Sequence, residues 1–122
     1  MIVKVDPASA VPVYEQIRSQ IAAKIAAERL PAGAKLPTIR QLAADLGLAV
    51  NTVAHAYREL EMSGLVETRP RHGTTVADGT GSAVKERLRA AARSYAELAR
   101  TLGISPREAT TIVKDAINNA VH

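Results

Sequence analysis

Residues 36–60 read LPTIRQLAADLGLAVNTVAHAYREL, and this stretch decides the fold. Its first half predicts a short helix, because four apolar residues recur at helical spacing: Ile39, Leu42, Ala43, Leu46. Thr38 precedes them and can cap the helix. Gly47 follows them at the point where a left-handed turn would end the helix. A second amphipathic run begins immediately after that turn, so the stretch predicts two helices joined by a tight turn.

The second run has an apolar and a polar face. Its buried face is expected to consist of Val53, Ala56, Tyr57 and Leu60, and its polar face gathers Asn51, Thr52, His55 and Arg58. An α-helix fits the DNA major groove and presents its N-terminal residues to base edges. The polar face is therefore a candidate DNA contact surface, and the alternative interpretation is a solvated helix face.

The flanking sequence completes a larger pattern. Upstream, a helix that Pro12 precedes and that ends near residues 30–33 is predicted by regularly spaced apolar residues: Val13, Ile17, Ile21, Ile25. Downstream, residues 65–68 and 74–76 are predicted as short strands joined by a basic hairpin, Arg69-Pro70-Arg71-His72-Gly73. Three helices followed by a two-stranded wing is the order of a winged helix-turn-helix.

A second region follows a small polar linker at residues 78–82. A long helix is expected beyond it, with a heptad-like apolar seam: Val84, Leu88, Ala91, Tyr95, Leu98, Leu102. Gly103 should end that helix, and Ser105-Pro106-Arg107-Glu108 is a capping box that starts the last one. The predicted fold is mainly α with a small β wing, divided into a winged domain (1–77), a linker (78–82) and a two-helix dimerisation region (83–122).

The tail also contains an apparent echo of the opening stretch. Residues 98–117 read LARTLGISPREATTIVKDAI and repeat the Leu-Gly-apolar turn. No wing follows, and the leading helix is longer, so we interpret the tail as a helical hairpin that pairs two copies of the chain. The alternative is a second DNA-facing helix, which would use Arg107, Thr110, Thr111 and Lys114.

Composition narrows the possible functions. The chain has 122 residues, a formal charge of +4 and no cysteine, which favours a polyanionic partner and excludes disulfides, thiol catalysis and cysteine-based zinc sites. The N-terminus lacks a signal-peptide pattern, so a cytoplasmic protein is expected, with no membrane partner. The Gly79-x-Gly81 segment lacks the surroundings of a phosphate-binding loop, and the three histidines lack metal-site spacing. We therefore expect no enzyme activity, metal or cofactor.

The chain resembles the GntR family of bacterial winged-helix transcription factors over about residues 10 to 77. The resemblance rests on the following motifs: PVYEQI (12–17), LPxGxxLPTxRxLA (30–43), NTV (51–53), AYxxL (56–60), GLV (64–66) and GTxV (73–76). It implies a DNA-binding dimer, usually a repressor, in which Arg40 contacts DNA, Asn51-Thr52 form the tip of the recognition helix and Gly73-Thr74 the tip of the wing. The short tail is similar in length and helix count to the YtrA-like subfamily, whose members often repress transporter operons.

These considerations define two sets of candidate residues. The DNA-binding set is Thr38, Arg40, Asn51, Thr52, His55, Tyr57, Arg58, Arg69, Arg71, His72, Gly73 and Thr74. The dimer-interface set is Val84, Leu88, Ala91, Tyr95, Leu98, Leu102, Ile112, Val113, Ala116 and Ile117. The expected partners are a palindromic double-stranded operator, a second copy of the chain and a small-molecule effector of unknown identity. The alternative is an interaction module with a basic surface that does not read DNA sequence.

Two positions depart from the family pattern. Ala49 stands where relatives often place a Ser or Asn that caps the recognition helix, and an alanine cap forfeits about 1 kcal/mol. Thr75 stands where an aromatic residue is expected in the second strand of the wing. Arg40 also has an alternative interpretation, a surface ion pair with Asp45 or a nearby glutamate.

Overall fold

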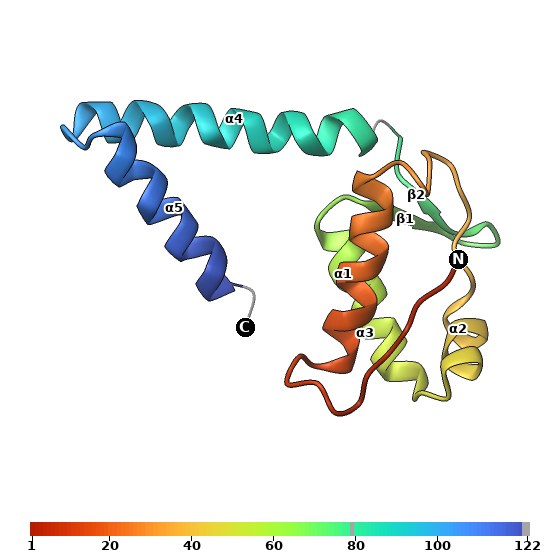
Figure 1. The fold of residues 1–122 in the computed structure, drawn as a ribbon. Coiled ribbons are helices and arrows are strands. Elements are labelled where there is room, and N and C mark those ends of the chain that lie inside the picture. The colour runs from red at the N-terminus through yellow and green to blue at the C-terminus, as the bar shows by residue number, and fades with distance from the viewer. Residues whose placement is uncertain (79, 121–122) are drawn as a thin grey trace. The chain divides into compact units, whose positions relative to one another are not determined.

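The computed structural model describes residues 1–78 and 80–120 (Figure 1). Within them the elements run in the order α1 (Val13–Ala26), α2 (Ile39–Leu46), α3 (Val50–Met62), β1 (Val66–Arg69), β2 (Gly73–Val76), α4 (Thr80–Thr101) and α5 (Pro106–Ala120). This order confirms the predicted winged helix-turn-helix followed by two helices. The backbone forms two compact units, Met1–Val84 and Lys85–His122.

The division expected at residues 78–82 stays a prediction. Gly79 lies outside the described residues, and α4 already begins at Thr80, inside the range expected to be a linker. Val84, expected in the seam of the tail, is half-buried and packs against the core of the first unit.

Helices α1 and α3 form the centre of the first unit. Ile17, Ile21 and Ile25 lie one turn apart on α1 and are fully buried. They belong to the same apolar cluster as the inner face of α3, which consists of Val53, Ala56, Tyr57 and Leu60. Burying one large aliphatic side chain contributes about 1.5–3 kcal/mol, so this cluster supplies most of the driving force for folding.

The ends of α2 agree with the sequence. Thr38 and Gln41 form a reciprocal capping box, in which each side chain accepts a hydrogen bond of 3.1 Å from the other residue's backbone N–H. Gly47 has a φ of 67° and closes the helix in the left-handed conformation. Ala49 precedes α3 with an extended backbone and makes no side-chain cap, as its sequence predicts.

Helix α1 ends earlier than expected, at Ala26 rather than near residues 30–33. Glu28 takes a left-handed φ of 59°, which turns the amides of Arg29 and Leu30 back onto the carbonyl of Lys24 at 2.9 and 3.2 Å. Backbone hydrogen bonding thus closes the helix without the glycine that usually marks such an end.

The wing contains more than the predicted hairpin. Strands β1 and β2 are antiparallel, with Val66 opposite Val76 and Arg69 opposite Gly73. The segment before α2 adds a third, short edge, because Leu36 donates to the Thr74 carbonyl at 2.9 Å and Val76 donates to the Ala34 carbonyl at 2.8 Å. The connection between α1 and α2 is therefore bonded into the sheet of the wing.

Two glutamines of α1 hold the N-terminal segment in an extended conformation. Gln20 pairs through its amide with the backbone N–H and carbonyl of Lys4, at 2.9 and 2.6 Å. Gln16 does the same with Asp6, at 2.8 and 2.9 Å, and also donates to the Val11 carbonyl. Val3 is buried as a result. The glutamine of the PVYEQI motif thus has a structural purpose that periodicity alone does not reveal.

Tyr57 ties α3 to the start of α2. Its side chain is only 4% exposed, and its hydroxyl donates to the Pro37 carbonyl at 2.7 Å. Burial raises the pKa of Tyr57 to about 12, because the phenolate would lose its hydration inside the protein. This bond holds the residue that precedes the cap of α2.

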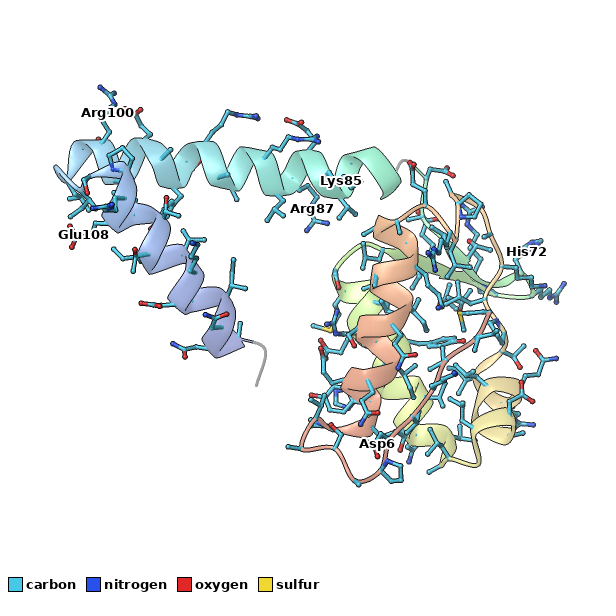
Figure 2. The ribbon with its side chains drawn as sticks, in the orientation of Figure 1. Asp6, His72, Lys85, Arg87, Arg100 and Glu108 are labelled. Atoms are coloured by element: carbon cyan, nitrogen blue, oxygen red, sulfur yellow. The ribbon has the colours of Figure 1, made fainter. Side chains whose placement is uncertain are left out.

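In the second unit, α4 and α5 meet at a turn around Gly103, which has a φ of 74°. Figure 2 labels Arg100 and Glu108 beside this turn. One of the two bonds of the predicted capping box of α5 is present among the described residues, since the Ser105 hydroxyl oxygen accepts from the Glu108 N–H at 3.2 Å. The Tyr95 hydroxyl donates to the Ala109 carbonyl at 2.7 Å and links the two helices. None of the described helices is both long and apolar enough to cross a bilayer.

The capping difference between α2 and α3 leads to a stability prediction. Ala49→Ser should raise the free energy of unfolding by about 1 kcal/mol, because the extended backbone at this position lets a serine hydroxyl accept a hydrogen bond from an amide in the first turn of α3. Thr38→Ala, the matched loss of an existing cap, should lower it by about the same amount. Urea denaturation followed by circular dichroism measures both. An unchanged midpoint for Ala49→Ser would mean that the start of α3 is already satisfied.

Tyr57 leads to a prediction about pH. Because the folded pKa of about 12 exceeds the unfolded value of 10.0, the contribution of this hydroxyl is fully present below about pH 10 and is lost as pH rises toward 12. Tyr57→Phe should cost about 1 kcal/mol at neutral pH, the usual net value of one hydrogen bond. The stability difference between the two proteins should shrink between pH 10 and 12 in denaturant titrations. A constant difference would contradict the buried hydroxyl.

Candidate nucleic-acid interface

The helix-turn-helix presents exposed polar side chains from both of its helices. Arg40 lies in the first turn of α2, and Asn51 and Arg58 lie on the outer face of α3. Thr38 is exposed at the α2 cap, and Thr52 is half-buried. Among the described residues Arg40 has no ion-pair partner, so the expected alternative of a pair with Asp45 does not occur. Its guanidinium is available to a ligand.

His55 belongs to a different surface from the one the sequence suggests. Its ring stacks on the ring of Tyr14 of α1, with centroids 3.7 Å apart and planes inclined by 16°. Its Nε2 atom also lies 3.5 Å from a carboxylate oxygen of Glu59, one turn further along α3. The stack directs the imidazole toward α1, and the side chain stays 39% exposed.

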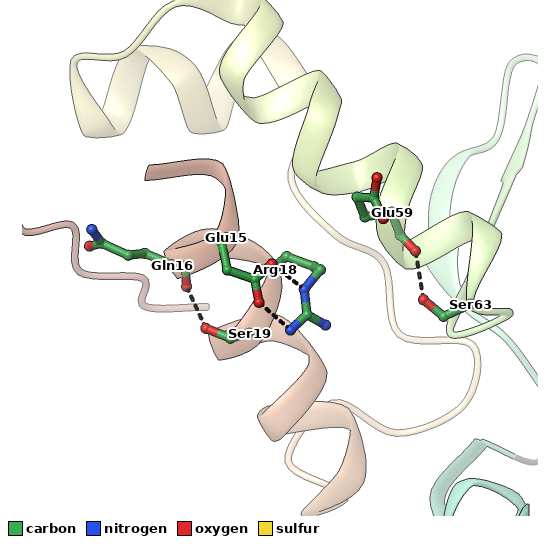
Figure 3. A network of polar contacts seen from close by, with 6 residues as sticks. All are labelled: Glu15, Gln16, Arg18, Ser19, Glu59 and Ser63. Carbon is green, nitrogen blue, oxygen red and sulfur yellow. Dashed lines mark hydrogen bonds and ion pairs between the residues drawn. The ribbon is translucent and has the colours of Figure 1, made fainter. Parts of the chain in front are cut away.

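A polar network continues along the same side of α1 and α3 (Figure 3). Arg18 donates from Nε to Glu15 at 2.7 Å, and this hydrogen bond lowers the pKa of Glu15. The same bond raises the pKa of Arg18, and attraction to Glu59 adds to the effect. The charge of Arg18 is therefore largely balanced within the protein, and this network borders the candidate interface.

Two residues of the predicted DNA-binding set are internal. Tyr57 is buried against Pro37, as described above, and Thr74 is only 9% exposed. The Thr74 hydroxyl lies 3.0 Å from the Thr68 hydroxyl across the hairpin. Direct DNA contact through these two side chains is therefore not what the structure provides. Tyr57 instead positions the start of α2, and Thr74 joins the two strands of the wing.

The wing carries two exposed arginines, Arg69 and Arg71, and the exposed His72 at its turn. Figure 2 labels His72 at this end of the hairpin. Arg69 lies 3.4 Å from Glu67, but both side chains are well exposed, so this pair contributes little and leaves Arg69 able to exchange partners. Arg71 adopts a left-handed φ of 70°, which forms the tight turn between the strands.

Lys35 extends the basic surface and was missed by the sequence interpretation. It is exposed and opposes Thr75 in the edge that joins the wing. A side-chain carbon added to Gly73 would lie 3.3 Å from the Lys35 Cε atom, so the lysine stem runs across this glycine. A signal was present, since Lys35 directly precedes the Leu36-Pro37-Thr38 motif, but its pairing with the wing depends on tertiary structure.

The candidate interface residues of the tail are mostly exposed. Leu88 is 73%, Leu98 55% and Leu102 65% exposed, and Ala91, Ile112, Ala116 and Ile117 are also exposed. Tyr95 and Val113 are half-buried and line a hollow of about 520 Å³ between α4 and α5, together with Ala96, Ala99, Ile104 and Ala109. Thr110 and Thr111 donate their hydroxyl protons to helix carbonyls, at 2.8 and 3.1 Å.

Comparisons with known proteins agree with this geometry. The family model described as bacterial regulatory proteins, gntR family, matches residues 13–76. The HTH-type transcriptional regulator Rv1152 of Mycobacterium tuberculosis is 44% identical over 108 residues, which cover 87% of this chain and 86% of the relative. The HTH-type transcriptional repressor YtrA of Bacillus subtilis is 35% identical over 96 residues, covering 72% of this chain and 74% of YtrA.

A solved structure extends the comparison to DNA. The DNA-binding domain of AraR in complex with operator ORX1 has a TM-score of 0.56 and 27% identity, and covers 63% of this chain and 99% of that one. The matched family and the two relatives, both of similar length, establish a regulator rather than an enzyme. The chain is a DNA-binding transcriptional regulator that belongs to the GntR family, close to its short YtrA-like members.

Proposed function

We propose that this protein is a homodimeric repressor that binds a palindromic operator through α2, α3 and the wing. The observation that carries the proposal is the pair of exposed polar side chains, Arg40 and Asn51, at the starts of the two helices of the helix-turn-helix. The name of the similar Bacillus subtilis protein, a transcriptional repressor, supports the direction of regulation.

The chemistry of each exposed side chain favours a particular kind of contact with DNA. Asn51, in the first turn of α3, suits bidentate hydrogen bonding to adenine in the major groove. Arg40, which has no ion-pair partner in residues 1–78 and 80–120, suits a guanine edge or a phosphate, and Thr38, Thr52 and Arg58 suit the flanking phosphates. Lys35, Arg71 and His72 of the wing region suit the phosphates or the minor groove. Base contacts would come from α3, and the wing would supply sequence-independent affinity.

The tail supports a second copy of the chain as its partner. Two leucines of α4 and Leu102, which directly follows it, are more than half exposed, and the hollow between α4 and α5 is lined mostly by alanine, valine and isoleucine. Covering one such leucine contributes about 1.5–3 kcal/mol, so an exposed seam of this kind favours association. A two-fold interface buries the seam against itself and provides two winged domains for two half-sites, with centres about 34–36 Å apart.

Three further predictions come from the resemblance and extend the proposal. We expect the operator to control a transporter operon, a small-molecule effector to regulate DNA binding, and the protein to act in the bacterial cytoplasm. The duplex enriched by the purified protein from its own genomic DNA identifies the operator and the genes beside it.

The DNA-reading roles lead to a quantitative prediction. Arg40→Ala and Asn51→Ala should each weaken operator binding by about 1–3 kcal/mol per half-site, a loss that counts twice in a dimer. Arg93→Ala is the matched control, because Arg93 is an exposed tail arginine already paired with Glu86. Fluorescence anisotropy with the enriched duplex measures all three, and circular dichroism verifies the fold. Normal operator binding by either variant would show that its side chain does not contact the operator.

Association through the tail leads to a second prediction. Leu98→Asp should convert the dimer into monomers and weaken operator binding, because association would bury an unpaired carboxylate in the seam. Ala90→Asp introduces the same charge at an exposed position of α4 outside the seam and should leave the dimer intact. Sedimentation equilibrium gives the mass of each variant. A stable Leu98→Asp dimer would place the interface elsewhere.

A further inference from the structure

We propose that His55 is a positioning residue: its ring, stacked on Tyr14, sets the rotation of α3 against α1 and thereby the direction in which Asn51 and Arg58 project. The inference rests on the proposed reading of an operator by α3. In this proposal, the side of α3 that packs on α1 contributes to DNA sequence specificity although His55 itself touches no base.

The stack provides an orientation-dependent link between the two helices. The rings of Tyr14 and His55 have centroids 3.7 Å apart and planes within 16° of parallel, so they are in full van der Waals contact. Tyr14 lies in the first turn of α1, and His55 lies in the second turn of α3. A rotation of α3 about its axis would slide the imidazole off the phenol ring.

An electrostatic attraction accompanies the stack one turn further along both helices. Glu59 follows His55 by one turn on α3, and its carboxylate lies 3.5 Å from the His55 Nε2 atom. Arg18 follows Tyr14 by one turn on α1, and attraction to Glu59 contributes to its raised pKa. The stack supplies the direct contact between the two helices, and this attraction adds a favourable charge pairing one turn further along.

The start of α3 needs such a restraint. Ala49 supplies no side-chain cap, and Asn51 lies in the first turn, one turn before His55 on the same face of the helix. Apart from the Tyr57 hydroxyl, which donates to the Pro37 carbonyl, the buried face of α3 packs through apolar contacts. The Tyr14–His55 stack depends on the orientation of both rings, so it favours one rotation of α3 against α1.

Substitutions in the full-length protein separate positioning from base contact. His55→Ala and Tyr14→Ala should each weaken binding to the enriched duplex by about fivefold to tenfold, the range expected for loss of one aromatic pair. The double variant should bind no more weakly than either single one, because both remove the same contact. His55→Phe keeps a ring for the stack and should restore most of the affinity. Tyr14→Phe, which loses only the hydroxyl, should bind like the wild type.

A set of duplexes with single base-pair changes provides the decisive measurement. A positioning role predicts that His55→Ala lowers discrimination at every base pair read by α3, and that His55→Phe restores it. Loss of discrimination at one base pair only, without rescue by His55→Phe, would overturn the proposal in favour of a direct contact. Wild-type binding by His55→Ala would also overturn it while leaving operator reading intact. Failure of the wild type to enrich any duplex would refute operator reading itself, and positioning with it.

Discussion

The packing of α1 against α3 is the constraint on which the rest of the DNA-binding unit depends. Three isoleucines at consecutive turns of α1 share one apolar cluster with the inner face of α3, and all three are fully buried. The recognition helix has its outer face free because its inner face is held in this way. The same contact brings Tyr14 onto His55 and Arg18 near Glu59, so the polar border of the interface follows from the apolar core.

The elements of the first unit were largely predictable from local patterns. Thr38, Gly47 and the apolar spacing of α2 and α3 predicted the helix-turn-helix, and the structure confirms the cap, the left-handed turn and the buried faces. The end of α1 was not predictable, because Glu28 adopts a left-handed conformation that glycine usually takes and no local signal marks it. The hydrogen bonds from Gln16 and Gln20 to the N-terminal segment were not predictable either, since amide side chains carry no periodic signal.

Side-chain direction was the harder part of the site to predict. Periodicity places His55 beside Asn51 on the polar face of α3, yet the His55 ring stacks on Tyr14 of α1. Tyr57 lies on the buried face of α3 but carries a hydroxyl that could also contact DNA. Its hydrogen bond to Pro37 shows that the hydroxyl holds the start of α2 instead. Lys35 joins the wing through pairing with residues about 40 positions away, which no local pattern encodes.

The third edge of the wing has a consequence for the energetics of DNA binding. Because Leu36 and Ala34 are hydrogen-bonded to β2, the segment that enters α2 belongs to the same sheet as the hairpin. Phosphates that contacted the wing tip would therefore act on the start of α2 through backbone hydrogen bonds, which reach the residue two positions before Thr38. Ordering the wing on DNA would then lower the entropic cost of ordering the helix-turn-helix, and the reverse.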